Sequence, residues 1–311
     1  ERLKNLADMN DLGSRITLML QKYPTSKTRD EAGMKERDEI FSNPLMSDES
    51  KMLSGTTLKR FYNFNVILNE WAGDYEASMG FAKKYADEVE KAVTNNRATL
   101  HEFIISQYSV LTSSVRTHKM DIYETAYSRL EDFQSRFPWA TERDRLEASF
   151  NLGLSVFSAS ADNYKPERGE QMLIDADENF RNYERVLSTQ QKIVWFFVIA
   201  RFCFSEGSYP DAGRWLNRLI QLPGSDVSQD YQCYARIMNL VVAYESGNPD
   251  RIEHELRRAY YFLTKRNKIY KYEKIILEYT RQAFRVRSQR EINEMLELMH
   301  RDLSAIQNDP F

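Results

Sequence analysis

The chain has 311 residues, of which 42% are hydrophobic and 13% aromatic, so it can bury a large core. Only 11 residues are Gly and 8 are Pro, which favours helices throughout. A formal charge of −3 neither demands nor excludes a nucleic-acid or membrane partner. No apolar run approaches the roughly 20 residues that a membrane-spanning helix needs, so no membrane association is expected.

The compartment is inferred from the cysteines and the N-terminal sequence. Both cysteines, Cys203 and Cys233, lie in apolar helical patterns and are expected to be buried, reduced thiols rather than a disulfide. No secretory signal is visible. We therefore expect a cytoplasmic protein.

Residues 1–56 are predicted to form a helical cap and an irregular connector. An amphipathic helix over residues 1–23 is followed by a short charged helix after Arg29. Asn43-Pro44 and Ser47-Asp48 are turn signals. This segment does not show the regular pattern of the rest of the chain.

A helix–break–helix pattern begins at Thr57 and is clearest over residues 192–222. There an apolar helix stops at Gly207, and an amphipathic helix begins near Pro210. In Gly207-x-Tyr209-x-x-Ala212, glycine tolerates a left-handed turn, tyrosine lies between the helices and alanine lets them approach closely.

Similar breaks recur at roughly forty-residue intervals, within the range of helical-hairpin repeats. They are predicted near Gly73, Asp121, Ser160, Gly207, Gly247 and Arg287. Helix starts are marked by the capping sequences Thr141-x-x-Asp144, Ser188-x-x-Gln191 and Ser288-x-x-Glu291. A single helix is predicted over about residues 168–187. We predict an all-α protein in which residues 57–311 form one continuous domain. This domain is expected to be an α-solenoid of about six antiparallel helical hairpins, coiled as a right-handed superhelix.

The repeat resembles that of tetratricopeptide-like proteins. The segments 207–217, 240–248 and 263–277 are similar to uncharacterised cytoplasmic tetratricopeptide-like proteins of bacteria. The resemblance is good over about residues 190–311 and only architectural before them. It implies a helical-repeat fold and a cytoplasmic location, but no activity. Members of that family tend to be longer at both ends, which implies that this chain is a fragment.

The sequence contains no recognisable catalytic constellation. It lacks a phosphate-binding glycine loop, a nucleophile elbow and a Cys-x-x-Cys pair. Glu297-x-x-His300 has the spacing of one half of a carboxylate-bridged di-metal site, but no second Glu-x-x-His accompanies it. Coincidence is the favoured interpretation. We therefore expect a protein that is not an enzyme and has no metal or cofactor.

Three aromatic triplets lie within apolar helical faces, where core residues belong. Packing between long helices is the favoured interpretation, and stacking platforms for nucleic acid are the alternative. The triplets are Phe61, Tyr62 and Phe64; Trp195, Phe196 and Phe197; and Tyr260, Tyr261 and Phe262.

The repeat register predicts a binding surface, because the first helix of each hairpin lines the groove of a tetratricopeptide array. A cationic groove with asparagine and aromatic residues suits an acidic peptide or a carboxylate. An ordinary solvated face is the alternative interpretation for the basic residues near the C-terminus. The predicted partner-binding residues are Arg60, Asn63, Trp71, His118, Asn151, Arg201, Lys274, Arg281 and Arg285.

The favoured function is a non-catalytic scaffold that binds a protein or acidic peptide in a groove that is cationic at its C-terminal end. The alternative is the effector-sensing half of a larger regulator whose output domain lies outside this chain. Direct nucleic-acid binding through Arg257–Arg290 is less favoured, because the first 250 residues are net acidic. The sequence predicts neither the partner nor the oligomeric state.

Overall fold

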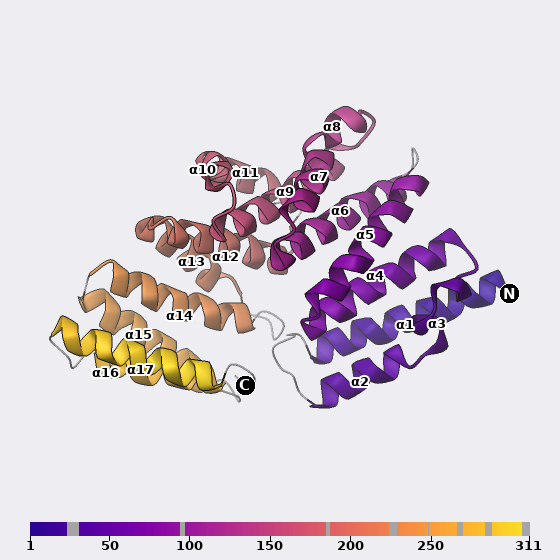
Figure 1. Ribbon diagram of the computed structural model, residues 1–311. Helices are drawn as coiled ribbons and strands as arrows, with labels where there is room; N and C mark the ends of the chain where they lie inside the picture. The colour runs from indigo at the N-terminus through magenta and orange to yellow at the C-terminus, as the bar shows by residue number, and fades with distance from the viewer. Residues whose placement is uncertain are drawn as a thin grey trace. The chain divides into compact units, whose positions relative to one another are not determined.

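The computed structural model describes residues 1–23, 31–93, 97–184, 187–223, 229–247, 249–265, 270–283 and 288–306. These residues form helices joined by short turns and contain no strand, so the all-α prediction is confirmed for them (Figure 1). In chain order the α-helices are α1 (Arg2–Lys22), α2 (Glu31–Phe41), α3 (Pro44–Ser47), α4 (Gly55–Ala72), α5 (Tyr75–Ala92), α6 (Arg97–Thr117), α7 (Met120–Glu131), α8 (Phe133–Arg136), α9 (Glu142–Ala161), α10 (Pro166–Ile174), α11 (Ala176–Tyr183), α12 (Thr189–Ser205), α13 (Tyr209–Gln221), α14 (Gln229–Glu245), α15 (Pro249–Lys265), α16 (Lys271–Ala283) and α17 (Gln289–Ala305).

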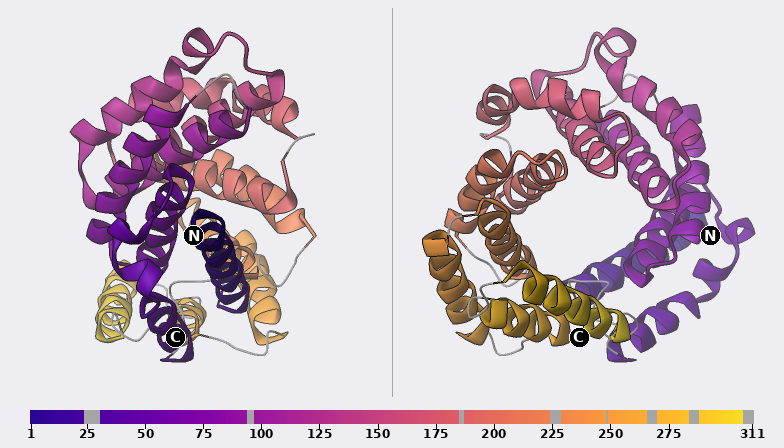
Figure 2. Two further views of the ribbon diagram at one scale, coloured as in Figure 1. Left: turned by 90° about the vertical axis from the view of Figure 1, so that its right-hand side faces the viewer. Right: turned by 60° about the vertical axis from the view of Figure 1, so that its left-hand side comes forward.

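The chain divides into two compact units. Unit 1 comprises Glu1–Ala159 and Ile174–Val186, and unit 2 comprises Ser160–Leu173 and Leu187–Phe311. In unit 1, α4, α5, α6 and α7 each pack against the next, and α1 packs on α4 (Figure 1). In unit 2, α12 to α15 do the same, and α16 packs against α17 (Figure 2). The helices of each unit therefore form consecutive hairpins.

The turns between paired helices confirm the predicted breaks wherever the structure describes them. Gly73, Gly207 and Gly247 adopt positive φ angles of 80°, 71° and 66°, which L-residues with a Cβ rarely adopt. The break near Asp121 lies slightly earlier, where His118 takes the left-handed conformation with φ 54°. The break predicted near Arg287 falls outside the described residues.

Small buried residues stand at the packing positions after these turns. Ala212 is fully buried, and Ser78 and Ala126 are almost fully buried at the corresponding positions of α5 and α7. The hydroxyl of Ser78 donates a 3.3 Å hydrogen bond to the carbonyl of Val66 on the partner helix α4. Close helix contact at these positions agrees with the predicted register.

The segment before α4 is more regular than a loop. The predicted charged helix is α2, and Asn43 and Asp48 cap α3 and the 3-10 turn Glu49–Lys51 through their side chains. Asn5 joins α1 to the end of this segment, since its amide donates to the carbonyl of Lys51 (3.2 Å) and accepts from the amide of Leu53 (3.1 Å).

The prediction of one helix over residues 168–187 is wrong. Asp175, with φ −100° and ψ 5°, interrupts the helix and separates α10 from α11. The break lets α11 bury Ala176 and Phe180, while Ile174 at the end of α10 stays 73% exposed.

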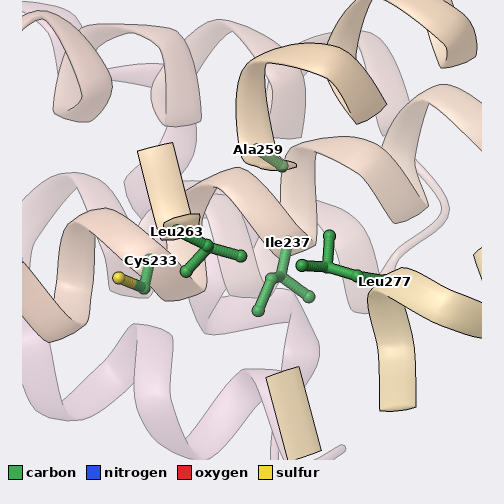
Figure 3. Close-up of a cluster of buried hydrophobic side chains, with 5 residues drawn as sticks. All are labelled: Cys233, Ile237, Ala259, Leu263 and Leu277. Atoms are coloured by element: carbon green, nitrogen blue, oxygen red, sulfur yellow. The ribbon is translucent and has the colours of Figure 1, made fainter. Parts of the chain in front are cut away.

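Apolar contacts join α14, α15 and α16 in unit 2. Cys233 and Ile237 from α14 meet Ala259 and Leu263 from α15 and Leu277 from α16 (Figure 3). Cys203 of α12 is also buried, and both cysteines are reduced thiols, as predicted. Burial raises the pKa of the Cys203 thiol to about 12, so it stays protonated at neutral pH.

The first prediction concerns Gly169 of α10. A Cβ there would lie 2.7 Å from ring atoms of Phe202 and 2.8 Å from Cβ of Ser160, so Gly169→Ala is expected to destabilise the fold by about 1–3 kcal/mol. Gly80 of α5 is the control because a Cβ there meets nothing within 4 Å; Gly80→Ala should stabilise by about 0.5–1 kcal/mol. Urea denaturation measures both, and equal effects would contradict the close contact of α10 with Phe202.

The second prediction concerns the Asn5 bridge. Asn5→Ala removes two hydrogen bonds, each of which contributes about 0.5–1.5 kcal/mol, so it is expected to destabilise the fold by about 1–3 kcal/mol. Hydrogen exchange should show faster exchange of the Leu53 amide than in the parent. Unchanged exchange at Leu53 would show that Asn5 does not bind this segment in solution.

Candidate functional site

A pocket of about 490 Å³ lies in unit 1 between α1, α4 and α6, with Tyr85 of α5 contributing to its wall. We call it the α1–α4–α6 pocket. It contains two of the predicted binding residues, Arg60 and Asn63, together with Lys59, His101 and Glu102. Met9, Phe64 and Ile105 also line the pocket.

Helical spacing explains why these side chains share one pocket. Lys59, Arg60 and Asn63 lie within one turn of α4, and His101 and Glu102 lie within the first turns of α6. On the opposite wall, Gly13 of α1 leaves room for Phe64, since a Cβ on Gly13 would lie 2.9 Å from the phenyl ring. The glycine therefore lets α1 approach α4 beside the pocket.

Lys59 and Glu102 form an ion pair that joins α4 to α6. The lysine side chain is 11% exposed and the glutamate side chain 37% exposed. A nearly buried ammonium needs such a partner, because desolvation disfavours an isolated charge. Each charge of the pair is therefore largely neutralised within the pocket itself.

Arg60 differs from its neighbour Lys59. It is half-buried on the pocket wall, and it has no ion pair or hydrogen bond with any of the described residues. The side-chain amide of Asn63, one turn later, is likewise without a hydrogen bond within the described part of the chain. A guanidinium and an amide thus supply unused donors to the same cavity.

His101 is the third cationic group of the pocket, and α9 holds it in place. Its Nδ1 lies 2.7 Å from Oε1 of Glu147, and its side chain is 58% exposed. The hydrogen bond to Glu147 raises the pKa of His101 above its usual value, with smaller contributions from the charges of Glu147, Glu102 and Asp144, and burial opposes them. The contact with Glu147 therefore shifts the titration of this imidazole to higher pH than that of a histidine without such a partner.

Sequence reasoning missed His101, Lys59 and Glu102. The repeat register contained a signal for His101, because one interval of roughly forty residues after Arg60 falls at this position. The Lys59–Glu102 pair had no such signal, since the pairing depends on how α4 packs against α6.

Two of the predicted binding residues are buried. Trp71 is 6% exposed, and its indole N–H donates a 2.9 Å hydrogen bond to the carbonyl of Tyr23. Asn151 is 7% exposed, and its amide donates to the carbonyl of Glu147 at 2.8 Å. Both side chains are thus engaged in internal contacts and offer little surface to a partner.

The remaining predicted residues lie at different places. His118 is exposed in the turn between α6 and α7, and Arg201 of α12 forms an ion pair with Asp162. Lys274 and Arg281 are exposed on α16, with no ion pair to the described residues. Arg285 lies outside the described residues. Arg60 and Asn63 are the two predicted residues that line the α1–α4–α6 pocket.

The expectation that the aromatic triplets form core is wrong for Tyr260 and Tyr261. They are 54% and 61% exposed on α15, whereas Trp195 and Phe196 are buried. The reason is that α15 uses Ala259 and Leu263 to face α14, which turns the two tyrosines outward. Lys265 covers the ring of Tyr261, with Nζ 4.2 Å from its centroid.

The described part of the chain shows neither a cluster of metal ligands nor a helix that could span a membrane. No group of three or more His, Cys, Asp or Glu side chains there could hold a metal ion. None of its helices combines the length and the apolar character of a bilayer-spanning segment.

Comparisons with known proteins give no family. No protein-family model matches the chain, and no curated protein is significantly similar to it.

Proposed function

We propose that this chain is a non-catalytic interaction scaffold that holds an acidic residue of a protein or peptide partner in the α1–α4–α6 pocket. The helical hairpins support the further proposal of a tetratricopeptide-like α-solenoid with a right-handed superhelix. A cytoplasmic location is proposed with it, since both cysteines are reduced thiols. Neither nucleic acid nor membrane is the proposed partner.

The observation that supports this proposal is that Arg60 forms no ion pair or hydrogen bond with the described residues. Arg60 lines a pocket in which the other α4 cation, Lys59, already has a carboxylate partner. An arginine without a counter-charge on a partly desolvated wall favours an incoming carboxylate, which it can bind through two parallel hydrogen bonds. Asn63 lines the same wall and can donate a further hydrogen bond.

The α16 stripe, defined as Lys274 and Arg281, supplies a second candidate contact for an acidic partner. The two residues are seven positions apart and therefore share one face of the helix. Glu278 is exposed between them and offsets part of their charge. The α16 stripe is for this reason the weaker of the two anion-binding candidates.

Effector sensing within a larger regulator is the second candidate function. The pocket volume of about 490 Å³ supports it, because small-molecule sites range from about 300 to 1,000 Å³. The mixture of apolar and charged groups would suit a small carboxylate as well as an acidic side chain. Competition between a free carboxylic acid and a peptide for the same pocket would distinguish the two.

The third prediction tests the role of Arg60. The probe is the tightest-binding octapeptide selected from a randomised library with a fixed central Glu, compared with the same peptide carrying Gln. The parent should prefer the Glu peptide, and Arg60→Ala should weaken its binding at least tenfold, because charged hydrogen bonds contribute about 1.5–3 kcal/mol. Fluorescence anisotropy at pH 7 measures both dissociation constants.

Two variants control this experiment. Arg143→Ala removes the same charge from an exposed position of α9 that does not line the pocket, and it should leave binding unchanged. Lys274→Ala with Arg281→Ala tests the α16 stripe. If the double variant loses binding while Arg60→Ala does not, the binding surface lies on α16. A parent without any preference for Glu over Gln would overturn the proposal.

The fourth prediction concerns Glu102, which forms part of the pocket wall and is paired with Lys59. Glu102→Gln removes a competing negative charge and frees the Lys59 ammonium, so it should tighten binding of the Glu peptide by roughly threefold to tenfold. The melting temperature should fall slightly, because a nearly buried lysine loses its partner. Weaker binding of the Glu peptide by this variant would place the carboxylate elsewhere.

A further inference from the structure

The hydrogen-bonding state of His101 has a consequence for ligand binding in the α1–α4–α6 pocket. Its Nδ1 lies 2.7 Å from the carboxylate of Glu147, and a carboxylate can only accept. Nδ1 must therefore carry a proton in either charge state of the imidazole. The charge state is decided at Nε2, which has no hydrogen-bond partner within the described residues.

Neutral His101 then presents a bare Nε2 lone pair, because the single ring proton stays on Nδ1 for Glu147. A lone pair repels the oxygen of an incoming carboxylate. Protonated His101 instead presents an Nε2–H donor and a positive charge. The contact with Glu147 thus makes His101 an acceptor in one charge state and an anion-binding donor in the other.

We propose that His101, oriented by Glu147, is the second anchor of the pocket beside Arg60, and that an acidic residue is bound there together with one proton. This inference rests on the proposed function, since it concerns the same pocket and the same carboxylate. It adds a residue that the repeat register did not identify. It also makes the affinity for an acidic partner depend on pH.

The charged groups around His101 come from α9, α6 and α4. Glu147 and Asp144 come from α9, Glu102 from α6 itself, and Lys59 and Arg60 from α4. Among the described residues, α5 contributes Tyr85 to the pocket, and those that α1 contributes carry no titratable group. Lys59 is matched by Glu102, which leaves Glu147 as the direct partner of His101.

The sign of the pH effect follows from these contacts. Glu147 raises the pKa of His101, so the protonated, binding-competent form predominates below this raised pKa and is lost as the pH rises through it. A bound carboxylate stabilises the protonated imidazole further. Affinity for the acidic peptide should therefore fall from pH 5.5 to pH 8.5. A peptide Glu, with a usual pKa near 4.3, stays ionised over this range.

The test uses the full chain and the selected Glu octapeptide. The parent should bind the peptide roughly fivefold more tightly at pH 5.5 than at pH 8.5, as expected for one added charge in a partly screened pocket. His101→Gln should bind equally at both pH values, with the weaker affinity. Glu147→Gln should move the transition to lower pH. His118→Gln changes an exposed histidine that does not line the pocket and should retain the dependence of the parent.

A second measurement needs no ligand. The imidazole NMR signals of the four histidines, with His101 assigned through His101→Gln, should show His101 titrating at higher pH than in the Glu147→Gln variant. Identical titration in parent and Glu147→Gln, or a pH dependence of binding that survives in His101→Gln, would overturn the inference. If Arg60-dependent binding is present without pH dependence, only this inference fails. If no Glu-selective binding occurs at any pH, the proposed function fails with it.

Discussion

The close approach of consecutive helices is the physical constraint on which the rest of this structure depends. Each helix buries one apolar face against the next, and residues with little or no side chain stand where the contact is tightest. At Gly169 even a methyl group would overlap Phe202. At Gly13 the missing side chain lets Phe64 lie against α1. Helices held at such short range carry polar side chains into shared pockets that no single helix could form.

The α1–α4–α6 pocket follows from this packing. It brings residues of α1, α4 and α6 to one cavity, although more than eighty residues separate the first from the last. The partly desolvated wall makes pairing of charges necessary, and Lys59 finds Glu102 on the neighbouring helix. Arg60 remains as the pocket cation without a carboxylate partner among the described residues, while His101 lines the same cavity with its Nδ1 paired to Glu147. The contrast between the paired Lys59 and Arg60, rather than the net charge of the chain, supports the proposal of an acidic partner.

The packing of neighbouring helices also decides which side chains of a helix are buried and which are exposed. The first helix of the α4–α5 hairpin carries Arg60 and Asn63 on the pocket wall and Trp71 in the core, where its indole binds the backbone of Tyr23. The tyrosines of α15 lie outside, because Ala259 and Leu263 already face α14. An aromatic residue in a periodic helix is thus core or surface according to which face the neighbouring helix covers.

The sequence by itself determined the helices, their turns and their pairing. Glycines at Gly73 and Gly207 mark left-handed turns because only glycine adopts positive φ without a steric penalty, and the box at Ser188 marks a helix start through local hydrogen bonds. Such signals act within a few residues and can be read along the chain. Arg60 and Asn63 were placed by the repeat register, which is also a property of the sequence. The interruption at Asp175, the pairing of Lys59 with Glu102 and the contact of His101 with Glu147 were decided only by the tertiary structure. The two side-chain pairings depend on the distance and rotation between helices far apart in sequence, and these are set by packing that has no local signature.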